Sequence, residues 1–242
     1  MRILVISDIH ANITALEAVI AANAMVDAVW CLGDLVGYGP DPNECVERIQ
    51  ALPNLTCLMG NHDAAVIDAL DLEKFNHDAS LSIHWTKSVL KPANFEYLKS
   101  LPERRGSSVF TLVHASPRSP IWEYVLDPYT ALLNFSYFET PFALVGHTHL
   151  PLAFTEDETS KQVKRELVKS TDQVKLTGRK ILNPGSVGQP RDHNPKASFA
   201  ILDPENMTWR IRRIEYDIAS VQNRIIAAGL PEKHAHRLAE GW

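Results

Sequence analysis

The segment most informative about the fold is Ile3-Leu4-Val5-Ile6-Ser7-Asp8-Ile9-His10, close to the first residue of the chain. Its four leading aliphatic residues form a continuous apolar run, which is typical of a strand buried on both faces of a helix-covered sheet. The run ends at the polar pair Ser7 and Asp8. Because alternate residues of an extended segment point the same way, we expect Asp8 and His10 to lie on one face.

The alternation of strand and helix continues after this stretch. Apolar residues at helical spacing predict a helix over residues 12–24, with Asn12 as its N-cap, and a second helix over residues 43–52. Apolar runs over residues 28–32 and 55–59 predict the strands that follow these helices. A strand, a helix and a further strand form the βαβ unit, so the sequence predicts a parallel sheet covered by helices.

The pattern changes at Pro151. Before it, residues 64–100 have helical character interrupted at Pro92, and strands are predicted over residues 109–113 and 142–145. After it, short segments separated by turn residues are typical of antiparallel strands, namely residues 152–155, 162–168, 173–176, 180–182, 198–202 and 208–214.

The sequence has no internal repeat and no linker, so it predicts a single α/β domain over residues 1–242, with a C-terminal helical segment over residues 218–240. With 45% hydrophobic and 22% charged residues, the 242-residue chain has the composition of a globular protein, which excludes a disordered one. Its formal net charge of -5 offers no basic surplus for a polyanion, so no stable nucleic-acid partner is expected.

No segment has the features of an export signal or a membrane span. The first apolar run is too short for a signal peptide, and no later run approaches the ~20 residues of a membrane-spanning helix. We therefore expect a cytoplasmic protein. Cys31, Cys45 and Cys57 form no C-x-x-C pair, so we expect small buried hydrophobes rather than a disulfide framework or a thiolate zinc site.

Side chains that can bind metals follow five of the predicted strands: Asp8 and His10, then Asp34, then Asn61 and His62, then His114, then His147 and His149. A single D-x-H or H-x-H pair is more simply explained as part of a satisfied core, but five independent strand ends are not. Ligands gather at the carboxyl ends of strands in open α/β sheets, so we expect one common site. Imidazole, carboxylate and amide donors without thiolates favour Mn²⁺, Fe²⁺ or Zn²⁺, and the two oxygens of Asp34 can bridge a pair of cations.

Five short motifs therefore occur in order: Asp8-Ile9-His10, Gly33-Asp34-Leu35-Val36-Gly37, Gly60-Asn61-His62-Asp63, Val113-His114-Ala115 and Gly146-His147-Thr148-His149. Together they closely resemble the calcineurin-like metallophosphoesterase family. The segment Asn183-Pro184-Gly185-Ser186-Val187-Gly188 resembles the late loop of its small bacterial and archaeal phosphodiesterase branch. The resemblance covers about residues 1–192 and implies a four-layer αββα sandwich, in which two mixed β-sheets are flanked by helices.

Carried over residue by residue, the resemblance implies a centre of two divalent metal ions. It assigns Asp8, His10 and His149 to one ion and Asn61, His114 and His147 to the other, with Asp34 as the bridge. Mn²⁺ is the first choice for both ions, and Fe²⁺, Zn²⁺ and Ni²⁺ are the alternatives. The resemblance also places His62 over the substrate as a catalytic residue and makes Asp63 the residue that orients it.

These features predict a metal-dependent phosphoric ester hydrolase. A hydroxide shared by the two ions would attack a phosphodiester, or a phosphomonoester, of a small organic phosphate. His62 is the candidate to donate a hydrogen bond or a proton toward the leaving oxygen. Asn61, His62 and Arg191 are the expected substrate contacts because a guanidinium is shaped to clamp a phosphate. A solvated or structural ion pair is the alternative for Arg191.

The alternative function is a catalytically inactive scaffold of the same fold that binds proteins, although such a scaffold would have lost metal ligands that are present here. A purely structural metal site is disfavoured because structural zinc sites are closed and four-coordinate. The sequence indicates no oligomeric state. The remaining histidines are expected on the surface or on helix faces: His77, His84, His193, His234 and His236. A group of aromatic residues is expected in the core, or else in the wall of the cleft: Trp122, Tyr124, Tyr129, Phe135, Tyr137 and Phe138.

Overall fold

The central strand of the first sheet is β1 (Ile3–Ile6), which is buried along its whole length, as its aliphatic run predicts. The computed structural model describes residues 1–157 and 159–242. In it, β1 runs parallel to β2 (Ala28–Cys31) on one side and antiparallel to β11 (Ala197–Asp203) on the other. The sheet has the order β3-β2-β1-β11-β12-β9, completed by β3 (Leu55–Cys57), β12 (Thr208–Ile214) and β9 (Val174–Lys175).

The second sheet has the order β4-β5-β6-β10-β7-β8. Its strands are β4 (Arg104–Gly106), β5 (Phe110–Val113), β6 (Phe142–Leu144), β10 (Arg179–Leu182), β7 (Leu152–Glu156) and β8 (Val163–Leu167). β10 pairs in parallel with β6 and antiparallel with β7. The predicted strand directions are confirmed, since the predicted early strands pair in parallel with one another and the late strands pair antiparallel with one another. The two halves do not form separate sheets, however, because late strands insert beside early ones in both sheets. Two mixed sheets are the result, as the αββα prediction requires.

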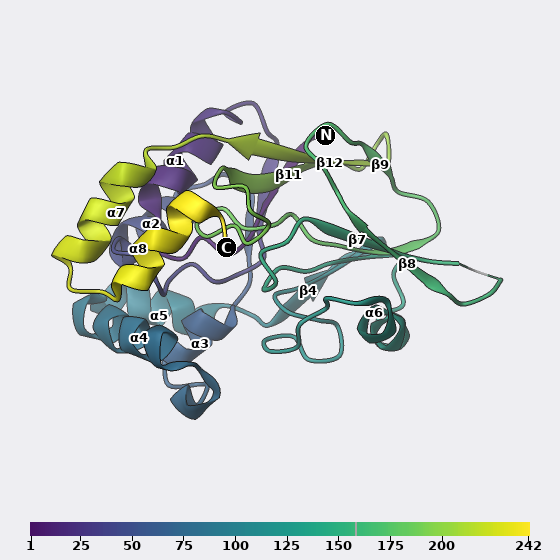
Figure 1. Cartoon of the computed structure of the whole chain (residues 1–242). Helices are drawn as coiled ribbons and strands as arrows, with labels where there is room; N and C mark the ends of the chain where they lie inside the picture. Colours follow the sequence, from purple (N-terminus) through teal and green to yellow (C-terminus); the bar gives the residue numbers. More distant parts are fainter. Residues whose placement is uncertain (158) are drawn as a thin grey trace.

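Helices cover the outer faces of both sheets (Figure 1). The α-helices are α1 (Ile13–Ala21), α2 (Pro42–Gln50), α3 (Asn61–Val66), α4 (His77–Val89), α5 (Pro92–Ser100), α6 (Pro128–Asn134), α7 (Ile218–Ala227) and α8 (Glu232–Glu240). Two 3₁₀ turns, Leu72–Lys74 and Phe135–Tyr137, complete the described helices. Asn12 caps α1 as predicted, since its Oδ1 accepts the Ala15 N–H at 3.0 Å.

The apolar core lies in three layers that hold the sandwich together. Side chains of α1 to α5 pack on the outer face of the first sheet, for example Leu16 against Leu4. Between the sheets, Val5 and Trp209 of the first lie in one cluster with Leu112 of the second. Ala131 of α6 lies in the cluster on the outer face of the second sheet. This is the four-layer αββα arrangement.

Helices α7 and α8 form an antiparallel pair with a small core of their own, which includes Ile225 and Leu238. The pair is fixed to the sandwich by Arg224, whose Nε and Nη2 donate to the two carboxylate oxygens of Asp41 at 3.0 and 2.9 Å. Asp41 precedes α2, so the C-terminal helices are tied to the first half of the chain. Bidentate arginine–carboxylate pairs restrain geometry as well as adding energy.

Two elements were not predicted, β4 and α6. β4 has the sequence Arg-Arg-Gly and is exposed throughout, so it carries no apolar signal. α6 is a short helix that begins at Pro128, with Asp127 as its N-cap. The three cysteines are buried and free, as predicted. Among the described residues, no helix is both long and apolar enough to cross a bilayer.

Candidate metal centre

The predicted ligands meet where the loops after five strands converge, at one end of the sandwich. Three of these strands belong to the first sheet (β1, β2 and β3) and two to the second (β5 and β6). The site therefore lies across the edge of both sheets rather than along one parallel sheet. All seven predicted ligands are at most 3% exposed: Asp8, His10, Asp34, Asn61, His114, His147 and His149.

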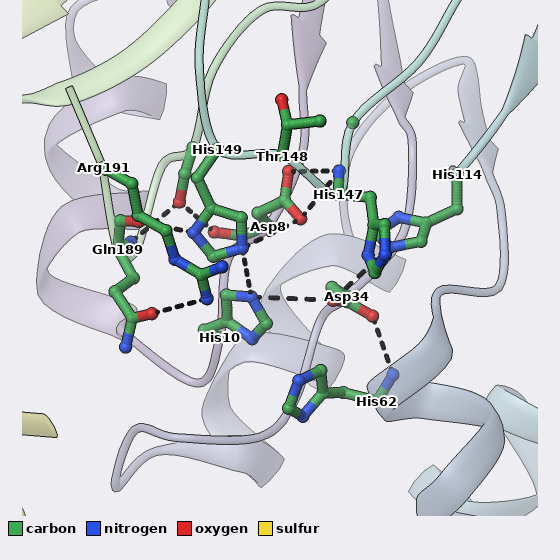
Figure 2. A network of polar contacts seen from close by, with 12 residues as sticks. Asp8, His10, Asp34, His62, His114, His147, Thr148, His149, Gln189 and Arg191 are labelled. Carbon is green, nitrogen blue, oxygen red and sulfur yellow. Dashed lines mark hydrogen bonds and ion pairs between the residues drawn. The ribbon is translucent and has the colours of Figure 1, made fainter. Parts of the chain in front are cut away.

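The first donor group consists of Asp8, His10 and His149 (Figure 2). The Nε2 atoms of His10 and His149 are 3.0 Å apart, and His149 Nε2 is 3.4 Å from Asp8 Oδ1. The backbone N–H of His147, in the loop after β6 of the second sheet, donates to Asp8 Oδ1 at 3.1 Å and restrains this carboxylate. These contacts bring together three side chains from loops far apart in the sequence.

The second donor group consists of Asp34, His114 and His147, with Asn61 beside it. His114 Nε2 is 3.1 Å from Asn61 Oδ1 and 3.4 Å from Asp34 Oδ2. The same Asp34 oxygen is 3.5 Å from His10 Nε2 in the first group. One carboxylate oxygen therefore lies between the two groups, which is the arrangement predicted for a bridging residue.

Backbone carbonyls fix the direction in which three of the imidazoles present their lone pairs. The Nδ1 atoms of His10, His114 and His149 contact the carbonyl oxygens of Val36, Leu32 and Gln189. Because a carbonyl only accepts, each Nδ1 carries the proton and each Nε2 faces the site. His147 is reversed: its Nε2 contacts the Trp122 carbonyl oxygen at 3.2 Å, which leaves Nδ1 for the site. Such contacts orient metal-binding histidines.

The donor set fits divalent cations. Burial lowers the pKa of both His10 and His149 well below the ordinary value. The two Nε2 lone pairs thus face each other at 3.0 Å without a proton between them. That repulsion is relieved by a shared cation, and neutral imidazoles with buried carboxylates are the ligands that borderline and hard divalent metals bind.

In the metal-free protein, a proton on His114 balances the negative charge of Asp34 in the second donor group. Burial alone would lower the pKa of His114, but the neighbouring Asp34 carboxylate outweighs it and raises the pKa to about 9. Burial would raise the pKa of Asp34, yet the surrounding imidazoles, His114 foremost, hold it well below its usual range. Burial raises the pKa of Asp8 to about 7. Cation binding at these residues therefore competes with protons.

The candidate ligands have an unusual backbone conformation. Five of them have φ in the left-handed region: Asp8 (56°), His10 (48°), Asp34 (57°), His147 (64°) and His149 (60°). The prediction that Asp8 and His10 share a face of an extended segment is therefore wrong, because the loop curls immediately after β1. Left-handed residues other than glycine cost about 1–3 kcal/mol each and cluster at functional sites.

Glycines allow the loops to approach this closely. A Cβ on Gly60 would lie 2.0 Å from Asp34 Oδ1, and a Cβ on Gly37 would lie 2.4 Å from His62 Nδ1. Either contact is far inside van der Waals distance. The glycines of the two predicted motifs thus leave space for the bridging carboxylate and for the His62 ring.

His62 lies beside the candidate ligands His10 and Asp34. Its ring is 4.9 Å from that of His10 and 4.4 Å from that of Tyr38, and its backbone N–H donates to Asp34 Oδ1 at 2.9 Å. Its Nδ1 is buried and has no hydrogen-bond partner among the described residues. His62 also lies within ligand distance of His10 and Asp34, so the geometry by itself allows a role as a ligand.

Asp63 does not orient His62 as predicted. Its two oxygens accept backbone N–H groups from Asp34, Leu35, Val36 and Gly60 at 2.9–3.2 Å. The carboxylate thus faces the loop that carries the bridging residue rather than the imidazole. The motif is adjacent in sequence, but the start of α3 at Asn61 turns consecutive side chains in different directions.

Arg191 reaches the edge of the centre, near His149 and His10 in Figure 2. Its Nη2 donates to Gln189 Oε1 at 2.9 Å, and its Cζ is 5.9 Å from the ring centre of Tyr38. Its Nε is buried without a partner among the described residues. Among residues 1–157 and 159–242, no acidic side chain has an oxygen within 4.0 Å of the Arg191 guanidinium nitrogens, so the alternative of a structural ion pair finds no support.

Sequence reasoning missed two residues at this edge, Tyr38 and His234. Tyr38 is buried and has a left-handed φ of 61°, a rare conformation for a bulky residue. Of the two positions expected for His234, the helix face is confirmed and the surface is wrong: the residue lies on the buried face of α8, is only 2% exposed, and has its ring 4.8 Å from that of Tyr38. The apolar spacing of α8 could have indicated that this face is buried.

The aromatic group divides between core and site. Phe135 and Phe138 are buried in the core, while Tyr129 and Tyr137 are exposed. Tyr124 stacks on His147 with ring centres 3.9 Å apart, and Trp122 contacts the same histidine. Trp122 and Tyr124 thus form a wall beside the second donor group. The Trp122 carbonyl oxygen accepts a hydrogen bond from His147 Nε2, and the Tyr124 ring covers the His147 ring.

Comparison with known proteins gives a consistent result. The model of the calcineurin-like phosphoesterase superfamily domain matches residues 1–207. An uncharacterized protein of Methanocaldococcus jannaschii is 41% identical over 247 residues, which cover 99% of this chain and 98% of that protein. A metallophosphoesterase structure from Sphaerobacter thermophilus is 47% identical, with a TM-score of 0.92 and coverage of 100% and 99%.

A hypothetical protein from Pyrococcus horikoshii OT3 has a similar fold at lower identity. It is 23% identical with a TM-score of 0.80, and the match covers 100% of this chain and 98% of that one. The family match ends at residue 207, so α7 and α8 lie beyond it.

Proposed function

The chain belongs to the calcineurin-like phosphoesterase superfamily, and on this premise we propose that it hydrolyses phosphodiester bonds of small organic phosphates, with phosphomonoesters as secondary substrates. The observation that supports this most is the position of Asp34 Oδ2, which lies within 3.5 Å of both His10 Nε2 and His114 Nε2. A carboxylate between two donor groups is what a two-metal site requires. The metal that we propose first is Mn²⁺.

The residues divide between two cations as follows. One would be held by Asp8, His10 and His149 and the other by Asn61, His114 and His147, with Asp34 shared. When bound, the cations would supply Lewis acidity, which neutralises charge on phosphoryl oxygens and lowers the pKa of an attacking water.

His62 then acts on the substrate through a hydrogen bond. Burial lowers its pKa to about 4, so the ring is neutral near pH 7 and retains one N–H. This favours a hydrogen bond to a phosphoryl or leaving oxygen over transfer of a proton. Such a donor stabilises charge that develops in the transition state, which is the larger contribution in many enzymes.

Arg191 and Asp63 support this chemistry in different ways. The guanidinium of Arg191 borders the first donor group and is suited to orient phosphate oxygens. Asp63 acts at a distance from the substrate: it fixes the backbone of residues 34–36 and so the position of Asp34.

The test is hydrolysis by metal-stripped protein to which Mn²⁺ is returned. Bis(p-nitrophenyl) phosphate serves as the diester and p-nitrophenyl phosphate as the monoester. We expect turnover of both, faster for the diester, and none without metal. If the protein binds two Mn²⁺ ions yet hydrolyses neither ester, the activity is wrong and the binding scaffold is the better explanation.

A further inference from the structure

Strand β8 ends the second sheet with a free edge. On one side it pairs antiparallel with β7, and among residues 1–157 and 159–242 no strand pairs with its other side. It has five residues, whereas the strands at the other three sheet edges, β3, β4 and β9, have three, three and two. In Figure 1 it lies at the end of the sandwich away from α7 and α8. An edge strand of this kind presents unpaired backbone groups to which a further strand can bind.

The hydrogen bonds to β7 show which backbone groups of β8 are free. Just before the strand, the Gln162 carbonyl oxygen accepts the Asp157 N–H at 2.8 Å, and just after it the Val168 N–H donates to the Pro151 carbonyl oxygen at 2.8 Å. Antiparallel partners exchange hydrogen bonds at every second residue, so the even-numbered residues of β8 bond to β7. The N–H and C=O groups of residues 163, 165 and 167 therefore point to the free edge.

The side chains of β8 alternate between two faces of the sheet. Val163 packs on the outer cluster that includes α6, so Arg165 and Leu167 lie on the same outer face. Lys164 and Glu166 lie on the opposite face and form an ion pair, with Lys164 Nζ 2.7 Å from Glu166 Oε1. All of these residues except Val163 are exposed. The strand thus has an apolar residue at each end and opposite charges on either side of Arg165.

We infer that two copies of this chain associate by pairing their β8 strands antiparallel about a twofold axis at Arg165. In this register, Lys164 of each copy lies opposite Glu166 of the other. On the outer face, Val163 of each copy lies opposite Leu167 of the other. The two six-stranded second sheets then form one continuous sheet. Such a contact is isologous: the same residues contribute from both copies, which closes the assembly at a dimer.

The free backbone groups fit this register. Residue 165 lies opposite its own copy and residue 163 opposite 167, so only odd-numbered residues, whose N–H and C=O groups are free, exchange hydrogen bonds. Each of these pairs exchanges two, which gives roughly six across the contact. Lys164 and Glu166 then occupy the non-hydrogen-bonded positions, where the Cα atoms are about 4.5 Å apart and side chains of opposite strands lie closest.

Charge selects this register over its neighbours. The two nearest registers that keep the same backbone groups paired place Lys164 opposite Lys164, or Glu166 opposite Glu166. Like charges directly opposite each other destabilise a strand pair. The sequence of β8 itself therefore supplies both halves of the charge complementarity, which favours a second copy of this chain as the occupant of the edge.

Arg165 faces its own copy in this register, which weakens the association. A carboxylate near each Arg165 offsets part of this repulsion. Hydrogen bonds from Thr130 and, more weakly, the charge of Arg165 hold the pKa of Asp127 below its ordinary value. The opposite edge of the same sheet offers no such balance: β4 carries Arg104 and Arg105 without an acidic residue, so two copies of β4 would align only like charges.

Sedimentation velocity over a wide range of protein concentration tests the pairing. We expect a reversible equilibrium between monomer and dimer for the unaltered protein. Lys164→Glu or Glu166→Lys alone leaves only like charges on that face of the contact, so each variant should dimerise about tenfold or more weakly. An equimolar mixture of the two variants should dimerise again, because the acidic strand of one then faces the basic strand of the other.

Arg165→Pro tests the backbone contact independently of these charges. The Arg165 N–H points away from β7, and proline is tolerated at such positions of edge strands. The variant should therefore keep its melting temperature close to that of the unaltered protein and lose the dimer. Lys175→Glu is the matched control, since it makes the same charge change as Lys164→Glu at an exposed residue of the edge strand β9 and should leave dimerisation unchanged.

Amide hydrogen exchange followed by NMR locates the contact. The amides of residues 163, 165 and 167 should become protected as the protein concentration rises, whereas those of 164 and 166 should be protected throughout by β7. A monomer at every concentration would overturn the proposal. A dimer that persists in Lys164→Glu, Glu166→Lys and Arg165→Pro would also overturn it, because another surface would then form the contact. None of these measurements depends on metal binding or turnover.

Discussion

Asp63 Oδ2 accepts the backbone N–H of Asp34 at 2.9 Å, so one buried carboxylate positions the residue that is shared by both donor groups. The other oxygen accepts the N–H groups of Leu35 and Val36. The contact is between side chain and backbone, and it makes Asp63 a positioning residue.

Replacing Asp63 by Asn should therefore loosen the centre without removing a ligand. Each oxygen of Asp63 accepts two backbone N–H groups, and an amide cannot accept at both ends, so two buried N–H groups lose their partner, at a cost of about 1–3 kcal/mol each. We expect a lower melting temperature and weaker Mn²⁺ binding. Asp68→Asn, at an exposed carboxylate paired with Lys87, should change stability by no more than about 0.5 kcal/mol. An Asp63→Asn variant that keeps its stability and metal affinity would contradict the assignment.

Asp34→Asn should lower the affinity for both cations, because the shared oxygen borders both donor groups. Asp8→Asn should weaken the first group more than the second, since Asp8 contacts only His149 among the ligand imidazoles. Metal content after dialysis, measured by mass spectrometry, distinguishes the two variants. Two ions at full occupancy in Asp34→Asn would exclude the bridging role.

His62→Ala should reduce kcat for an aryl phosphodiester about 10²–10⁴-fold, the range for loss of a positioned catalytic side chain, while both metals stay bound. His236→Ala is the control, because His236 is an exposed histidine on α8. Loss of one metal in His62→Ala would instead identify His62 as a ligand, which its distance from His10 and Asp34 allows.

Metal affinity should rise with pH. His114, whose pKa is raised to about 9, carries a proton at neutral pH that the cation must displace. Below about pH 9 the apparent affinity should therefore fall about tenfold per pH unit, more steeply below 7, where Asp8 also becomes protonated. Calorimetric Mn²⁺ titrations in buffers of different ionisation enthalpy measure the released protons. No release near neutral pH would show that His114 is not displaced.

The sequence predicted most of the fold because its buried strands are continuous apolar runs. β1 and its helix α1 could be placed closely from spacing and the Asn12 cap. The pairing of β1 with β11 could not, because local spacing says nothing about which distant strand lies alongside. The short strand β4 could not be predicted because it has no apolar residue, and for the same reason it contributes little to the core.

The clustering of the candidate metal ligands was predictable because these residues immediately follow strands, where topology gathers them. The direction of each side chain was not. Left-handed φ values at Asp8 and His10 reverse the expected alternation, and such conformations depend on the neighbouring loops. Asp63 was wrongly predicted to orient His62 because the start of α3 turns consecutive side chains in different directions. The packing of His234 on α8 against Tyr38 was missed because it joins residues almost 200 positions apart in the sequence.

The pairing of the first strand has a consequence for biosynthesis. β1 is flanked by β2 and by β11, with Ile3 opposite Leu202. During translation one edge of β1 therefore stays unpaired until most of the chain has left the ribosome, and contacts of such long sequence separation form slowly. Asp8, at the end of that strand, takes its place late. Metal loading should therefore follow release of the nearly complete chain, and nascent chains that end before β11 should capture no cation.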